Sequence, residues 1–242
     1  MRLLNTTTIA LEVFDNDPPP YAILSHRWED EEVSFQDIED GRAKEKRGYH
    51  KIQMACGIAA TAGIEHIWVD TCCINKGDSA ELSEAINSMY LWYEESTICY
   101  VYMSDLPSTW PIPTYSRNDF QKSRWFERGW TLQELLAPSA VVFLNNDWEE
   151  VGTKLNLWEY ITARTGIPGI ILHGQDVQSA SIAQRMSWAA DRRTTRIEDR
   201  AYSLMGLFGV NMPLLYGERQ NAFLRLQEEI IKTSNDHSIF AW

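Results

Sequence analysis

Short apolar runs that alternate with helical patterns limit the possible folds of this chain more than any other feature. Four runs have the length and character of buried strands: YAILS (21–25), HIWVD (66–70), ICYVYM (98–103) and AVVFL (140–144). Three segments between them have helical spacing: 49–63, 80–96 and RGWTLQELLA (128–137). Since parallel strands require such crossovers, the alternation predicts an α/β fold with a mostly parallel sheet flanked by helices. TIALEVF (8–14) adds an edge strand at the amino-terminal side.

Helical patterns replace the strand pattern after about residue 150. They occupy LNLWEYITART (155–165), SIAQRMSWAADR (181–192), IEDRAYSLMGLF (197–208) and ERQNAFLRLQEEIIKT (218–233). Their apolar stripes need cover, so we expect them to pack on the sheet domain and not to fold alone. The sequence is therefore divided into an α/β core, residues 1–150, and a helical extension, residues 151–242.

Composition excludes several classes of function. The 34 acidic and 22 basic residues give a net charge of −12, which disfavours binding to a nucleic-acid backbone. The opening segment does not have the pattern of a signal peptide, and no long apolar run predicts a membrane span, so a cytoplasmic protein is expected. The four cysteines have no CxxC pair and the five histidines are scattered, which predicts reduced thiols and neither a metal site nor a bound cofactor.

The carboxyl ends of parallel strands are the expected place for a ligand site. Ser25, His26, Arg27 and Trp28 stand at the end of the first buried strand, and Asp70 ends the second. All of these can converge on one cleft with the helix that precedes the fourth buried strand.

Residues 128–138 raise the question of what that helix contributes. At about 100° per residue, its three leucines form one stripe, whereas Trp130 and Glu134 fall together on another side. A tryptophan and a carboxylate thus share a face that packing of the leucines does not require.

Each candidate also has a structural explanation. Asp70 can order its loop, Arg27 can pair with a surface carboxylate, Trp28 and Trp130 can cover the sheet ends, and Glu134 can be a solvated helix residue. The segment DRRTTRIEDRAYS (191–203) is interpreted as a salt-bridged helix start. A GxSxG, Walker A or GxGxxG motif is missing from the sequence, which argues against the hydrolases and nucleotide-binding folds that use them.

Several long blocks resemble a known family. YAILSHRWED (21–30), IWVDTCCIN (67–75) and SRWFERGWTLQELLAP (123–138) look like the three blocks of the fungal HET (heterokaryon incompatibility) domain, and residues 194–218 resemble the segment that follows them in fungal NLR-like incompatibility proteins. HET domains are in turn similar to TIR domains, whose sheet is five-stranded and flavodoxin-like. The chain departs from that pattern in an amino-terminal strand, a loop with Pro107, Pro111 and Pro113, and the helical extension.

The resemblance implies a cell-death effector of fungal innate immunity that hydrolyses NAD at the nicotinamide–ribose bond. Trp130 and Glu134 match the Trp-x-x-x-Glu pattern of TIR NAD hydrolases, so the resemblance implies that Glu134 is catalytic. A carboxylate suits this role because the transition state is a ribosyl oxocarbenium ion. The implied substrate contacts are Ser25, His26, Arg27, Trp28, Asp70 and Trp130, with Arg27 on the diphosphate.

Two other functions stay open. A non-enzymatic module can trigger cell death by homotypic contacts, and self-association is expected of an active form in any case. The polar loop TCCINKGDS (71–79) suits such an assembly interface. A hydrolase that acts on a related nucleotide through the same cleft is the third hypothesis.

Overall fold

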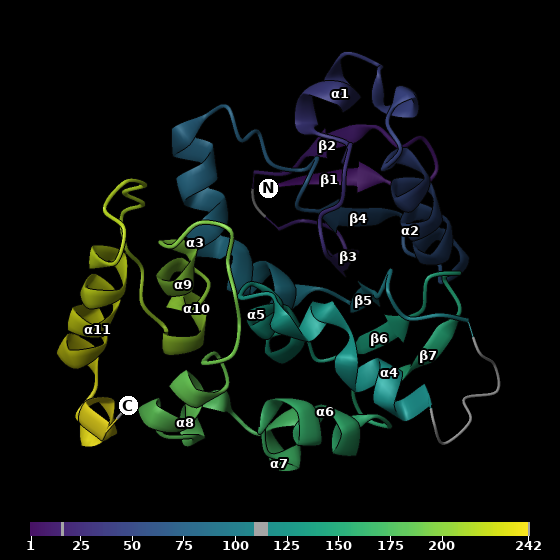
Figure 1. The fold of residues 1–242 in the computed structure, drawn as a ribbon. Coiled ribbons are helices and arrows are strands. Elements are labelled where there is room, and N and C mark those ends of the chain that lie inside the picture. Colours follow the sequence, from purple (N-terminus) through teal and green to yellow (C-terminus); the bar gives the residue numbers. More distant parts are fainter. Residues whose placement is uncertain (16, 109–115, 242) are drawn as a thin grey trace.

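A seven-stranded sheet forms the centre of the computed structural model, which describes residues 1–15, 17–108 and 116–241 (Figure 1). The strand order is β2-β1-β4-β3-β5-β6-β7. Its four central strands are parallel: β3 (Tyr21–His26), β4 (His66–Val69), β5 (Ile98–Tyr102) and β6 (Val141–Leu144). Along the sheet they run second, first, third, fourth in chain order, as in flavodoxin-like folds. The expected α/β fold of the TIR-like, flavodoxin-like type is confirmed.

Antiparallel strands close both edges of the parallel centre. β1 (Arg2–Asn5) pairs with β4 and with β2 (Leu11–Val13), and β7 (Glu150–Thr153) pairs with β6. The sequence predicted neither β1 nor β7. β1 has only four residues, and β7 reads EVGT, with a single apolar residue to mark it as a strand.

The single edge strand predicted for residues 8–14 is wrong in its first half. The side chain of Asn5 accepts the backbone N–H groups of Thr7 and Thr8 at 3.0 and 3.1 Å, which turns the chain. Asparagine favours such turns because its side chain substitutes for a backbone acceptor. The strand therefore begins only at Leu11.

β3 is the central strand of the parallel region. Its six residues are all buried, because β4 and β5 pair with it on either side and helices cover the faces of the sheet. In the register with β5, Ile23 pairs with Cys99 and Ser25 pairs with Val101. β4 is added on one side of β3, whereas β5 and β6 follow on the other side. A crevice for a ligand is expected between β3 and β5, where the strand order reverses in this way.

Three helices of the core follow the predicted segments: α2 (Tyr49–Thr61), α3 (Ser79–Glu95) and α5 (Thr131–Leu136). Two further helices, α1 (Phe35–Glu39) and α4 (Ser116–Lys122), were not predicted. Asp78 caps α3 by accepting the backbone N–H groups of Ala80 and Glu81 at 2.9 and 3.2 Å. All six residues of α5 are buried, so this short helix has no solvent face. Pro111 and Pro113 of the predicted loop lie outside the described residues.

Helices of the extension lie beside and below the sheet in Figure 1. They are α6 (Trp158–Thr165), α7 (Gly169–Leu172), α8 (Ile182–Ser187), α9 (Asp199–Tyr202), α10 (Met205–Phe208) and α11 (Asn221–Thr233). One continuous helix was predicted over residues 197–208, but α9 and α10 are separate four-residue helices. The division into a core, residues 1–150, and an extension, residues 151–242, that does not fold alone stays a prediction.

Close contact between α10 and α3 gives a test of how tightly the extension packs on the core. A Cβ atom on Gly206 would lie 2.1 Å from Cβ of Tyr90, closer than any relaxed contact. We therefore expect Gly206→Ala to lower the free energy of unfolding by about 2 kcal/mol or more, measured by urea denaturation. Gly57→Ala is the matched control, because Gly57 lies exposed within α2 with nothing within 4 Å of its added Cβ. This control should stabilise by ~0.5–1 kcal/mol through helix propensity.

Candidate functional site

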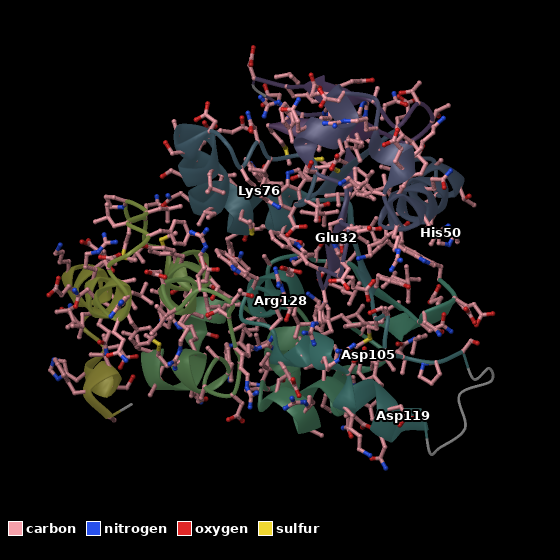
Figure 2. The ribbon with its side chains drawn as sticks, turned by 45° about the horizontal axis from the view of Figure 1, so that its top comes forward. Glu32, His50, Lys76, Asp105, Asp119 and Arg128 are labelled. Atoms are coloured by element: carbon pink, nitrogen blue, oxygen red, sulfur yellow. The ribbon has the colours of Figure 1, made fainter. Side chains whose placement is uncertain are left out.

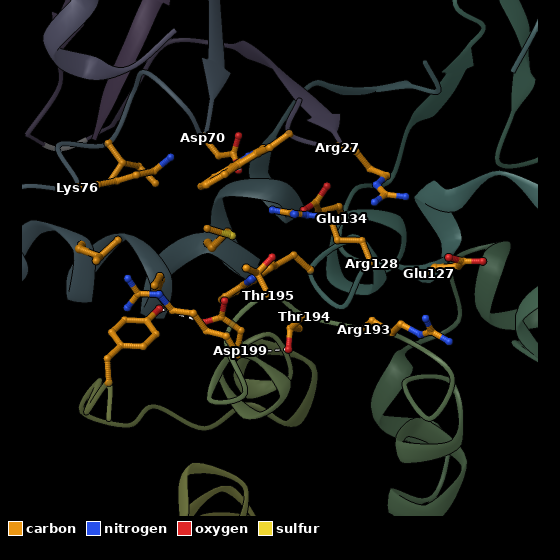
Figure 3. A pocket seen from close by; sticks show the side chains of 18 of the residues that line it. Arg27, Asp70, Lys76, Glu127, Arg128, Glu134, Arg193, Thr194, Thr195 and Asp199 are labelled. Atoms are coloured by element: carbon orange, nitrogen blue, oxygen red, sulfur yellow. Dashed lines mark hydrogen bonds between the residues drawn. The ribbon is translucent and has the colours of Figure 1, made fainter. Parts of the chain in front are cut away.

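A cavity of about 570 Å³ lies beyond the carboxyl ends of the parallel strands, between the core and the extension (Figure 3). The loop after β3, the loop after β4, the face of α3 and the turn that leads into α5 form its core side. Residues 193–196, α9 and the loop before α11 form its other side. The crevice predicted at the strand ends is therefore present, and the extension closes it.

Glu134 lies in the wall of this cavity but is only 4% exposed. The hydroxyl of Ser25 donates a hydrogen bond to its carboxylate, and the Trp125 indole N–H donates to the Ser25 oxygen at 2.9 Å. Burial raises the pKa of Glu134 to about 7, while the Arg128 charge and the Ser25 hydrogen bond oppose that shift. The carboxyl group is thus held in one orientation and can exist in either protonation state near neutral pH.

The backbone before α5 is fixed by hydrogen bonds to its carbonyl oxygens. The Thr131 hydroxyl is 2.7 Å from the Trp125 carbonyl oxygen. From the extension, the buried guanidinium of Arg192 donates to the Arg128 carbonyl at 3.1 Å and to the Thr131 hydroxyl at 2.9 Å. These contacts position the helix that carries Glu134.

A short parallel bridge joins the same turn to the extension. The Gly129 N–H donates to the Arg193 carbonyl at 2.8 Å, and the Arg193 N–H donates to the Glu127 carbonyl at 2.6 Å. A side chain on Gly129 would place its Cβ 2.5 Å from the Thr194 methyl group, so only glycine allows this approach. The bridge holds residues 193–196 against the pocket.

The pocket holds more basic side chains than carboxylates, which are Asp70, Glu127, Glu134 and Asp199, although the chain as a whole carries −12. Its basic residues are Arg27, Lys76, Arg124, Arg128, Arg193 and Arg196. Arg124 pairs with Asp105 at 3.3 Å, but the other five form no ion pair with any described carboxylate. Figure 2 shows Lys76 and Arg128 coming from separate segments near the middle of the molecule. Such unpaired cations in a cleft attract anionic ligands.

Trp28 connects several of these groups. Its indole N–H donates a hydrogen bond to Asp70 at 2.8 Å. The Lys76 ammonium and the Arg128 guanidinium make cation–π contacts with its ring, at 3.7 and 5.2 Å from the ring centroid. Trp28 is still 44% exposed, so part of its ring stays available to a ligand.

Similarity to known proteins identifies the family of the chain. The family described as "Heterokaryon incompatibility protein (HET)" matches residues 21–111. The "Vegetative incompatibility protein HET-E-1" of Podospora anserina is 46% identical over 226 residues, which cover 88% of this chain. The chain contains a HET domain. It spans 16% of the length of that relative, and no solved structure matches it.

The structure brings most of the predicted site residues of the HET domain together. Arg27, Trp28, Asp70, Trp130 and Glu134 all line the pocket. The predicted substrate contacts Ser25 and His26 are instead buried beneath it and are not among its lining residues; Ser25 contacts Glu134.

His26 lies in a nearly dry environment. Burial lowers its pKa to about 3, and its Nε2 atom is 3.8 Å from a carboxylate oxygen of Asp70. The imidazole is therefore neutral at physiological pH and supplies no charge for a phosphate. Its predicted contact with substrate remains untested.

The sequence interpretation missed the contribution of residues 191–203. The predicted helix start is confirmed, because α9 begins at Asp199 with Glu198 as its N-cap. Its predicted salt bridges are wrong, since none of Arg196, Glu198, Asp199 and Arg200 forms an ion pair within the described part of the chain. Instead Arg196 and Asp199 line the pocket, and Glu198 accepts the N–H groups of Gly217 and Arg219 at 2.8 and 3.0 Å. The two arginines and two threonines at 193–196 were the available signal, but only the fold places them opposite Glu134.

Other kinds of site find no support among the residues that the structure describes. No group of three or more histidine, cysteine, aspartate or glutamate side chains is arranged to hold a metal ion there. In the same ranges, none of the helices combines the length and the apolarity needed to cross a bilayer. All four cysteines are buried and free.

The raised pKa of Glu134 predicts a pH-dependent effect of its replacement on stability. Between pH 4.5, the usual value for a glutamate, and pH 7 the unfolded chain loses this proton while the folded protein keeps it. The contribution of Glu134 to the free energy of unfolding therefore falls across this window by up to about 3 kcal/mol. We expect the melting temperature of Glu134→Gln, relative to the wild type, to rise from pH 4.5 to pH 7 and then to level off. A difference that stays constant with pH would contradict the raised pKa.

Proposed function

We propose that this HET domain hydrolyses NAD at the nicotinamide–ribose bond and that it thereby acts as a cell-death effector in vegetative incompatibility. The observation that carries the proposal is a preorganised, buried carboxyl group, Glu134, in the wall of a pocket rich in unpaired cations. The similarity to the vegetative incompatibility protein of Podospora anserina supports the biological role.

The proposed reaction needs a group that stabilises positive charge at the ribose. Nicotinamide leaves with the electron pair of the C1′–N bond, and an oxocarbenium ion develops on the ribose. The Glu134 carboxylate stabilises this cation because it is fixed by Ser25 in a site with little water. Water then adds at C1′ and releases a proton, which gives ADP-ribose and nicotinamide.

The arginines near Glu134 bind the diphosphate in this proposal. Arg27 and Arg128 line the pocket without carboxylate partners among the described residues, and a guanidinium can donate two parallel hydrogen bonds to phosphate oxygens. The exposed part of the Trp28 ring and the half-buried Trp130 offer surfaces for stacking of the nicotinamide ring.

Replacement of the glutamate tests the reaction. Glu134→Gln keeps the shape and still accepts the Ser25 hydrogen bond, but it removes the charge. We expect turnover of NAD, followed by nicotinamide release from purified protein, to fall by about 10²-fold or more. Glu159→Gln on the exposed side of α6 is the control and should keep full activity.

The same pair of variants separates the enzyme from an interaction module in cells. Glu134→Gln should abolish killing while the protein accumulates to the level of the control. Full killing by soluble Glu134→Gln protein would instead support a non-enzymatic module that acts by homotypic contacts. Release of a base from another nucleotide, with NAD untouched, would support the related hydrolase.

The pH profile gives a second test of Glu134 in the free enzyme. Only the carboxylate stabilises the ribosyl cation, and its pKa is raised to about 7. We therefore expect kcat/KM for NAD to rise about tenfold per pH unit below pH 7 and to reach a plateau above it. A profile that is flat between pH 5.5 and pH 8 would remove Glu134 from the rate-determining chemistry.

A further inference from the structure

The pocket has two chemically different halves. Glu134, Arg27 and Arg128 lie in one half, near α5. The other half has an apolar floor on α3, formed by Leu82, Ile86 and Met89. Figure 3 shows Lys76 and Asp199 around this second half, on the opposite side of the view from Arg27 and Glu127. The chemistry proposed above uses only the first half.

Groups from the extension face the apolar floor. The Arg196 guanidinium lies 4.2 Å from the centroid of the Tyr216 ring, and the Tyr216 hydroxyl donates to Asp199 at 3.0 Å. Burial raises the pKa of Asp199, although the hydrogen bond from Tyr216 and the Arg196 charge oppose the shift. These three residues are ordered by one another and need no ligand to hold their positions.

We infer that this second half is a subsite for the adenosine phosphate part of the dinucleotide. The inference rests on the proposed function and assigns the extension a direct role in substrate binding. A purine has flat apolar faces that match the surface of Leu82, Ile86 and Met89. The Asp199 carboxylate can accept ribose hydroxyl groups, as acidic side chains do in other dinucleotide sites. Lys76, which lies against the Trp28 ring, and Arg196, which lies against the Tyr216 ring, line the same pocket and supply cations for the phosphate.

Separation of the two halves has a kinetic consequence. Contacts that are equal in the ground state and in the transition state change KM and leave kcat unchanged, and we expect the contacts of this remote half to be of that kind. For a substrate that lacks the adenosine phosphate half, changes in the subsite should alter neither KM nor kcat. Nicotinamide mononucleotide is such a substrate, because it keeps the bond to be cleaved.

Binding of adenosine 5′-monophosphate tests the subsite without any catalysis. The probe is titrated by calorimetry into the 242-residue chain carrying Glu134→Gln, alone or with Arg196→Ala or Leu82→Gln. Leu82 comes from α3 and Arg196 from the extension, and thermal melts check that each variant is folded. We expect each to weaken binding about tenfold. Arg200→Ala, on the exposed side of α9 and outside the pocket, is the control and should bind normally.

Hydrolysis of two substrates by Arg196→Ala completes the test. We expect KM for NAD to rise about tenfold with kcat within about twofold of the wild type, and both constants for nicotinamide mononucleotide to stay within about twofold. Equal effects on both substrates, or normal binding of adenosine 5′-monophosphate by Leu82→Gln, would overturn the subsite. If the wild type hydrolyses neither substrate, loss of adenosine 5′-monophosphate binding in both variants still supports the subsite, and only the proposed reaction falls.

Discussion

The hydrogen bond between Ser25 and Glu134 joins the central strand of the sheet to the short buried helix α5, and the site is built around it. A buried carboxyl group destabilises a protein when it is charged, so it requires donors that cannot move away. Ser25 is one such donor because β3 is paired on both sides, and Trp125 in turn holds the serine oxygen. The same burial that opposes ionisation strengthens the electrostatic attraction between the ionised carboxylate and a nearby positive charge. Stability and proposed activity therefore change in opposite directions as the pH rises toward 7.

The extension completes the pocket through its backbone as well as its side chains. The bridge between Gly129 and Arg193 and the contacts of Arg192 with the start of α5 leave little freedom between the two parts. Residues of the extension such as Arg196 and Tyr216 thus share one cavity with Glu134, while the Arg193 carbonyl and the Arg192 guanidinium help to position its helix. A sheet domain of this type without such an extension would have an open cleft here.

The sequence predicted the parallel centre of the fold because apolar runs and helical periods are local signals. It also predicted Arg27, Trp28, Asp70, Trp130 and Glu134 as neighbours, since strand ends converge at one edge of a parallel sheet. The antiparallel edges escaped prediction because β1 and β7 are short and have little apolar alternation. Lys76, Arg128, Arg196 and Tyr216 escaped it because loop and turn residues reach the pocket only through tertiary contacts.

The register between β3 and β5 determines which side chain of β3 faces Glu134. Side chains alternate along a strand, so a shift by one residue would turn Ser25 to the opposite face of the sheet and replace it with Leu24 or His26. Glu134 would then face either a side chain that cannot hydrogen-bond to it or a neutral imidazole. A change in the register of the central strand would therefore separate Ser25 from Glu134, so the pairing of the sheet also determines the chemistry of the carboxyl group.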